Sequence, residues 1–186
     1  MEDLLYAGLG AGAAMTLVAA RQHLSGFIGQ RPRDYRGQLP VFDLRGHLAG
    51  DLLMEGVIFG PTGRASSRFV AEARATWAGN RCVMTEEFRY ESGRTQRREW
   101  RLTLGNDGAI RAEADDVPGG GRGWQSGNAV LLRYPIRLPA DAGGHVLKVT
   151  DWMYLTPGGT IMNRSQFHKF GIKVAELVAS IRPRAA

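Results

Sequence analysis

The stretch DWMYLTPGGTIMNRSQFHKFG, residues 151–171, contains two strand-like runs on either side of the turn sequence TPGG. Before the turn, apolar residues occupy every second position around Asp151, at Leu147, Val149, Met153 and Leu155. This period of two is typical of a strand with one buried face, and Asp151 falls on that face. If residues 156–159 form a four-residue loop, antiparallel pairing sets Asp151 opposite Arg164. The stretch therefore predicts a hairpin with a buried ion pair, because a carboxylate in a core is unfavourable unless a cation pairs with it.

The chain beyond Phe42 predicts more strands of the same kind. They cover residues 51–60, 67–77, 81–90, 96–104, 109–114 and 130–138, and residues 172–182 fit either a closing strand or a helix. Strands at this spacing, joined by short glycine-containing loops, indicate a mainly β fold built as an antiparallel meander. A meander of this length either splits into a sandwich or closes into a barrel, which removes its exposed edges.

Two shorter segments carry signals of their own. The sequence Phe42-Asp43-Leu44-Arg45 predicts a short helical turn with Asp43 as its N-cap. The glycine-rich residues 119–123 lack the Lys-Ser/Thr pair and the following helix of a phosphate-binding loop. We interpret them as a flexible connection.

Length and composition indicate one ordinary globular domain, with 186 residues, 44% hydrophobic and 23% charged. The net charge of +6 comes mostly from arginines that are scattered and interleaved with acids. This pattern favours a solvated basic surface over a nucleic-acid interface. The single cysteine, Cys82, has no disulfide partner and no zinc-type spacing around it, so we expect a small buried side chain. The four histidines are isolated in the sequence, and we expect neither a metal nor another cofactor.

Several motifs, in order along the chain, resemble one bacterial family. They are EEFRYESG at residues 86–93, Arg98-x-Trp100, ADDV at 114–117, GNA at 127–129 and the opening stretch. The family is catalogued as domain of unknown function 3833 and is thought to be lipocalin-like, and the similarity covers residues 42–183. The chain departs from it at Thr150-Asp151, where the family has two aspartates, and in the lipoprotein signal that members tend to carry. The resemblance implies an up-and-down, lipocalin-like β-barrel and a periplasmic location.

The N-terminal 40 residues have a different character. The segment from Leu4 to Ala20 contains no charged residue and has the length of a short membrane span. Acidic rather than basic residues precede it, which does not fit a secretory signal. We expect either a membrane-associated helix or an extension that is poorly ordered or docked, and then a linker over residues 26–40. The expected division is an N-terminal hydrophobic helix and linker, residues 1–40, and a barrel domain, residues 41–186.

The alternation and the resemblance together imply a barrel interior lined by large side chains. Those expected to point inward are Trp77, Met84, Phe88, Tyr90, Trp100, Tyr134, Met153 and Met162. They suit either a lipid-sized pocket or a solid core. A three-residue loop at residues 91–93 sets Glu86 opposite Arg98 as a second buried pair. Each pair is either a structural salt bridge or a source of an arginine for a ligand's carboxylate or phosphate.

Three functions remain as alternatives. The first is non-catalytic binding or carriage of a small hydrophobic, lipid-like ligand, either neutral or anionic, near a membrane. The second is an isomerase- or hydratase-type enzyme, by fold analogy, which needs an inward carboxylate with a raised pKa. The third is a structural role at a membrane, contacted through the segment from Leu4 to Ala20. The expected ligand-binding residues are Glu86, Phe88, Tyr90, Arg98, Trp100, Tyr134, Asp151, Met153, Asn163 and Arg164.

Overall fold

The computed structural model describes Tyr6, Gly8, Gly10, Gly12, Thr16, Leu17 and residues 26–184. The chain forms two compact units, Met1–Asp34 and Tyr35–Ala186. The six described residues before residue 26 are helical, and the short 3-10 helices η1 (Phe27–Gly29) and η2 (Pro32–Tyr35) follow. The rest of the expected helix from Leu4 to Ala20 lies outside the described residues. Within the described part, no helix combines the length and the apolar character that crossing a membrane requires.

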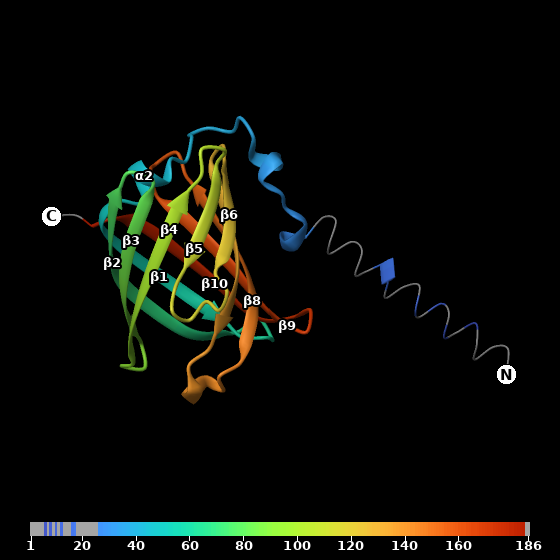
Figure 1. Ribbon diagram of the computed structural model, residues 1–186. Helices are drawn as coiled ribbons and strands as arrows, with labels where there is room; N and C mark the ends of the chain where they lie inside the picture. The colour runs from blue at the N-terminus through green and yellow to red at the C-terminus, as the bar shows by residue number, and fades with distance from the viewer. Residues whose placement is uncertain are drawn as a thin grey trace. The chain divides into compact units, whose positions relative to one another are not determined.

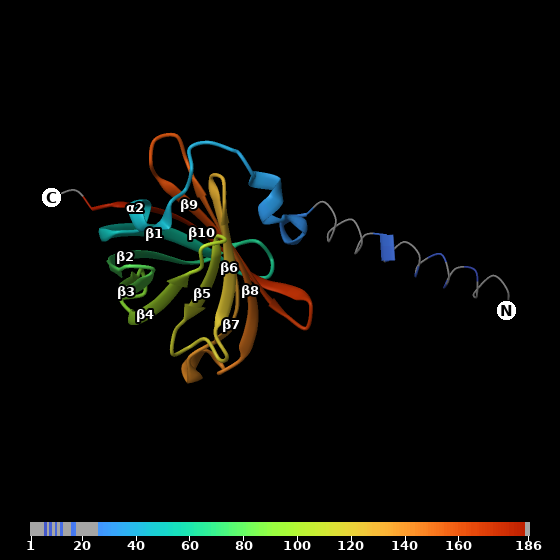
Figure 2. The same cartoon turned by 45° about the horizontal axis from the view of Figure 1, so that its top comes forward.

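Ten antiparallel strands of the second unit form a closed barrel, as predicted (Figure 1). Each strand pairs with its neighbours along the chain, and β1 pairs with β10 to close the ring, which Figure 2 shows with the α2 end turned forward. The strands are β1 (Gly50–Phe59), β2 (Ala65–Ala78), β3 (Arg81–Tyr90), β4 (Thr95–Leu104), β5 (Ala109–Glu113), β6 (Gly121–Ser126), β7 (Ala129–Arg137), β8 (Val146–Leu155), β9 (Ile161–Lys169) and β10 (Ile172–Pro183). The 3-10 helix η3 (Ala140–Ala142) lies between β7 and β8. Closure gives every strand two partners and leaves no open sheet edge in the described barrel.

The β8–β9 hairpin has a longer loop than the sequence suggested. Leu155 pairs with Ile161, so five residues form the loop instead of four. The Thr156 N–H donates to the Thr160 carbonyl oxygen at 2.9 Å and closes it. Asp151 therefore lies opposite Ser165, and the predicted pairing of Asp151 with Arg164 is wrong.

This register decides which side chains of β9 enter the barrel. A shift by one residue moves every side chain of a strand to the opposite face. Arg164 and Met162 are consequently exposed on the outer surface, and the prediction that Met162 points inward is also wrong. Asn163 and Ser165 are buried and face the interior in their place.

Strand β6 was not anticipated, because its first residues belong to the glycine-rich stretch at 119–123. The interpretation of that stretch as a flexible connection is wrong for Gly121 and Gly123, which are buried between β5 and β7. A Cβ on Gly123 would lie 2.2 Å from the Leu131 carbonyl oxygen, and one on Gly121 would lie 2.7 Å from the Tyr134 Cβ. Glycine in this strand thus allows a close approach of neighbouring chain rather than flexibility.

Helix α2 (Leu44–His47) closes one end of the barrel, at the top of Figure 1. Asp43 is its N-cap, as predicted, and its carboxylate accepts a hydrogen bond from the Arg45 N–H at 3.1 Å. The helix is fastened on two sides of the barrel. Trp77 Nε1 in β2 donates to the Leu48 carbonyl oxygen at 2.8 Å, and the Leu44 N–H donates to Gln125 Oε1 in β6 at 3.2 Å.

The opposite end of the barrel is open. The inward side chains nearest to α2, such as Leu52 and Leu102, are buried. Those toward the other end, such as Phe88, Ile136 and Leu177, are only half-buried although they face the interior. The β1–β2, β3–β4, β5–β6, β7–β8 and β9–β10 connections surround this opening.

Candidate ligand-binding cavity

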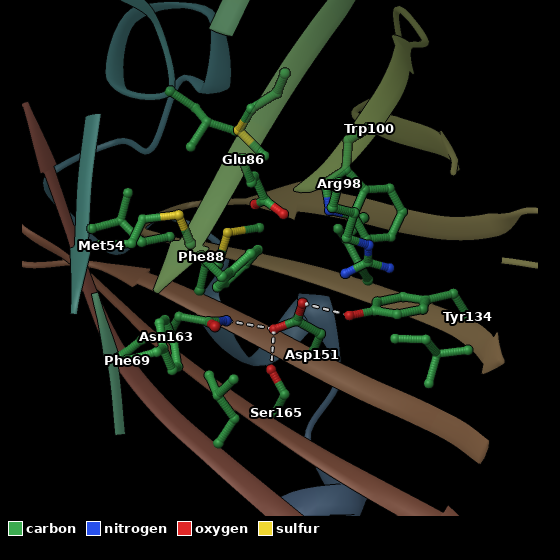
Figure 3. A pocket seen from close by; sticks show the side chains of 18 of the residues that line it. Met54, Phe69, Glu86, Phe88, Arg98, Trp100, Tyr134, Asp151, Asn163 and Ser165 are labelled. Atoms are coloured by element: carbon green, nitrogen blue, oxygen red, sulfur yellow. Dashed lines mark hydrogen bonds between the residues drawn. The ribbon is translucent and has the colours of Figure 1, made fainter. Parts of the chain in front are cut away.

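The barrel interior contains a cavity of about 110 Å³, shown in Figure 3. Large apolar side chains form most of its wall, among them Met54, Phe69, Phe88, Trp100 and Met153. Six polar side chains interrupt this wall, namely Glu86, Arg98, Tyr134, Asp151, Asn163 and Ser165. The aromatic and methionine side chains therefore do not fill the interior completely.

Most residues expected from the sequence lie together in this cavity, with two exceptions. Tyr90 lies outside the cavity lining, stacks on Phe88 and donates from its hydroxyl to Gln96 Oε1 at 3.1 Å. Arg164 lies on the outer surface, where it forms an ion pair with Glu176. The other eight expected residues line the cavity.

Asp151 is held in the cavity wall by three hydrogen-bond donors rather than by a cation. Its Oδ1 accepts from Asn163 Nδ2 and from Ser165 Oγ, the latter at 2.9 Å. Its Oδ2 accepts from the Tyr134 hydroxyl at 3.3 Å. Burial raises the pKa of Asp151, and the three hydrogen bonds act in the opposite direction. Burial likewise raises the pKa of Tyr134, so the phenol stays protonated and keeps donating.

Arg98 enters the cavity from β4 in a fixed orientation. Its Nε lies 3.1 Å from Asp116 Oδ1 and 3.0 Å from Asp116 Oδ2. Its guanidinium carbon lies 4.1 Å from the centre of the Trp100 ring, in the geometry of a cation–π contact. Arg98 Nη2 is buried, and among the described residues it has no hydrogen-bond partner. The ion pair and the ring thus hold the guanidinium while one donor is left over.

Glu86 lies opposite Arg98 in the β3–β4 pairing, as predicted, and is 3% exposed. Its Oε2 is also buried without a hydrogen-bond partner in the described part of the chain. Burial raises the pKa of Glu86 to about 7; the charge of Arg98 opposes this shift, and the charge of Asp151 adds to it. Near neutral pH the side chain is therefore divided between a carboxylic acid, which can donate a hydrogen bond, and a carboxylate, which can only accept.

Two polar residues of the site were missed by the sequence analysis, as were apolar wall residues such as Met54 and Phe69. Asp116 lies in the connection between β5 and β6, where no strand periodicity applies, and the ADDV motif was its only signal. Ser165 was assigned to the outer face by the four-residue loop, and it becomes inward-facing with the observed register. Asp116 forms an ion pair with Arg98, and Ser165 donates a hydrogen bond to Asp151, so both contact charged side chains that the sequence did identify.

The cavity offers a fixed cation, a carboxyl group that titrates near neutral pH, and apolar walls. Buried polar atoms are nearly always hydrogen-bonded in folded proteins, so Arg98 Nη2 and Glu86 Oε2 are candidates for contact with a bound molecule. Within the described residues, no three His, Cys, Asp or Glu side chains gather into a group that could hold a metal ion. Cys82 is a free, buried thiol, as predicted, and burial raises its pKa to about 11.

A family model described as "Protein of unknown function (DUF3833)" matches residues 22–183. A search of curated proteins gives no match.

Solved structures of other proteins share the fold. The S-type phycobiliprotein lyase CPES from Guillardia theta aligns with a TM-score of 0.57 and 8% identity over 76% of this chain and 90% of the lyase. Rv2717c from M. tuberculosis aligns with a TM-score of 0.55 and 15% identity over 76% of this chain and 97% of that protein. A protein of unknown function of the DUF3598 family, from Nostoc punctiforme, aligns with a TM-score of 0.55 and 11% identity over 78% of this chain and 50% of its own. At these identities the likeness concerns the fold alone.

Proposed function

The chain belongs to the DUF3833 family of proteins of unknown function, and we propose that its barrel binds a small hydrophobic molecule with an acidic group. The observation that carries this proposal is the pair of unpartnered buried atoms, Arg98 Nη2 and Glu86 Oε2, at one apolar cavity. A carboxylate accepts a charge-assisted hydrogen bond from Arg98 and a second one from protonated Glu86, which would satisfy both groups.

The size of the cavity limits the buried part of the ligand. A dry protein cavity of about 150 Å³ holds benzene. At about 110 Å³, this cavity has room for a short chain or small ring of roughly six carbon atoms or fewer. A longer ligand would extend through the open end, past Phe88 and Leu177. Carriage of such a molecule close to a membrane is part of the proposal.

The test compares an acid with its neutral counterpart on the full chain, by isothermal titration calorimetry with hexanoate and 1-hexanol. We expect Arg98→Met to raise the Kd for hexanoate by about 10- to 100-fold, the equivalent of a lost hydrogen bond to a charged group. The Kd for hexanol should change less than about twofold, because an alcohol does not need the cation. Arg97→Met is the matched control, since Arg97 directly precedes Arg98 in β4 and is exposed on the outer face. Unchanged hexanoate affinity in a folded Arg98→Met protein would rule out this role for Arg98.

A second candidate function is proton transfer by Glu86. A buried carboxyl group with a pKa of about 7, facing a cavity, is suited to act as general base and general acid at neutral pH. One structural neighbour is named a lyase, so a barrel of this fold carries an enzyme in at least one protein. Glu86 would remove the proton between a carbonyl group and a double bond and return it at the far carbon of that double bond. Arg98 Nη2 would meanwhile donate to the carbonyl oxygen.

The probe for this candidate is the conversion of cyclohex-3-en-1-one to cyclohex-2-en-1-one, followed by the absorbance of the conjugated product. We expect turnover by the native chain and its loss in Glu86→Gln. Glu87→Gln, which changes an exposed carboxylate next to Glu86, should keep the native rate. Equal rates in both variants would remove Glu86 from the chemistry.

A further inference from the structure

The tip of the β9–β10 hairpin has an unusual sequence for its geometry. Lys169 pairs with Ile172, so Phe170 and Gly171 alone form the turn. Both have positive φ, 52° and 82°, which is the pattern of a type I′ turn. The first position of such a turn favours Asn, Asp or Gly, because other side chains are disfavoured in the left-handed region. Phe170 therefore occupies a position that its backbone preference opposes.

Phe170 brings the fold no compensation in packing. Its side chain is 93% exposed, the highest value among the exposed large hydrophobic residues of the described chain. Lys169 Nζ lies 5.6 Å from the centre of its ring. Phe170 buries almost none of its surface in the barrel, and an apolar side chain that is both exposed and in a disfavoured backbone conformation is typical of a contact site for another molecule.

Two more apolar side chains are exposed beside it. Ile172, the first residue of β10, is 70% exposed, and Val146, the first residue of β8, is 43% exposed. The last β8–β9 pair joins Lys148 to His168, so Val146 and Phe170 each lie two residues beyond it at the same end of neighbouring strands. This end is the open one, away from α2, where Figure 1 shows the red β9–β10 hairpin. We call these three residues, with the lysines described next, the hairpin patch.

The basic residues of the hairpin patch are all lysines. The sequence contains 24 Lys and Arg residues but only three lysines, and these are Lys148, Lys169 and Lys173. All three lie on the ends of β8, β9 and β10 that form the patch. Lysine extends an apolar stem along a greasy surface while its ammonium group reaches outward to phosphate. Glu176 pairs with Lys173 Nζ at 2.7 Å, and Arg164 shares that carboxylate, so the local balance of charge stays positive.

We propose that the hairpin patch docks the barrel onto a membrane surface containing anionic phospholipid, with Phe170 and Ile172 entering the headgroup region and the three lysines contacting phosphates. A protein partner fits the patch less well. A stable protein interface needs about 800 Å² from each partner, whereas this patch consists of three apolar side chains on two protruding strand ends. An apolar tip ringed by basic residues is the pattern of an interfacial membrane contact. Such docking turns the open end of the barrel toward the lipid.

The lysines provide a direct readout of the patch in the full chain, whatever the N-terminal segment does. The protein is treated with an acetylating reagent, alone or with vesicles, and acetylation of each lysine is quantified by peptide mass spectrometry. With vesicles of phosphatidylcholine and phosphatidylglycerol in a 3:1 ratio, we expect acetylation of Lys148, Lys169 and Lys173 to fall at least fivefold. Vesicles of phosphatidylcholine alone should protect them less than twofold.

Phe170→Asn is the decisive variant, because asparagine suits the turn and should keep or improve the stability of the hairpin. We expect this variant to lose the protection by anionic vesicles and to float with them at least fivefold less in a density gradient. Val83→Thr is the matched control, since Val83 is 46% exposed at the α2 end, and it should behave like the native chain. Lysines that react equally with and without anionic vesicles would overturn the proposal, even if the protein floats. Full protection in Phe170→Asn, or equal protection by the neutral vesicles, would overturn it as well.

Discussion

Glu86 and Arg98 face each other across the β3–β4 ladder, yet the ion pair of Arg98 is formed with Asp116. The consequence is a guanidinium that is neutralised from one side and available from the other. Glu86, left without a full partner, has its pKa raised to about 7 by burial. Because the pKa of Glu86 lies near neutral pH, the site is sensitive to pH. The first two predictions follow from this.

The stability of the native chain should fall relative to Glu86→Gln as pH rises from about 4.5 to about 7. In this window an unfolded Glu86 is ionised while the folded one keeps its proton, so raising the pH favours unfolding. The total effect is about 3 kcal/mol, and it should level off above pH 7. Urea denaturation at pH 4.5, 6, 7 and 8 measures it, with Glu87→Gln on the outer face as the control. Parallel pH profiles of the native chain and Glu86→Gln would contradict the buried, protonated state of Glu86.

The affinity for hexanoate should decrease above pH 7. If protonated Glu86 donates to the bound carboxylate, each pH unit above its pKa raises the Kd about tenfold, because one proton is taken up on binding. Glu86→Gln keeps a donor at every pH and should flatten the dependence. Calorimetry at pH 6, 7, 8 and 9 gives the slope. A native slope of zero would mean that Glu86 does not touch the acid group.

Asp151 should be energetically coupled to Ser165 and uncoupled from Arg164. Ser165 Oγ donates directly to Asp151, whereas Arg164 lies on the outer surface with Glu176. A double-mutant cycle of Asp151→Asn with Ser165→Ala should give a coupling of about 1 kcal/mol or more. The cycle of Asp151→Asn with Arg164→Gln should be additive within about 0.5 kcal/mol. The reverse result would restore the four-residue loop and its register.

Gly123→Ala should destabilise the barrel by about 3 kcal/mol, because the new methyl group collides with the backbone of β7. Gly158→Ala is the matched control, since a Cβ there meets nothing within 4 Å, and its effect should stay below about 1 kcal/mol. Thermal unfolding followed by circular dichroism compares the two. Equal melting temperatures would show that β6 can move away from β7 at no cost.

Alternation is a local signal and was sufficient to predict an antiparallel meander, whereas the choice of a barrel over a sandwich came from the family resemblance. Alternation was insufficient where a one-residue difference in loop length decides which face of a strand a side chain occupies. Nothing in TPGGT distinguishes a four-residue loop from the observed five-residue loop, and that difference exchanged Arg164 for Ser165 and Asn163. Strand β6 carried little apolar alternation because glycine stands where β7 comes closest, at Gly121 and Gly123. Asp116 reaches Arg98 from a connection, through a contact between segments that no local pattern encodes.

Because α2 closes one end of the barrel, a bound ligand must leave through the same opening by which the next ligand enters. An incoming ligand cannot displace the bound ligand from a second opening. Exchange of one ligand for another should therefore proceed at the dissociation rate of the first ligand, whatever the concentration of the second.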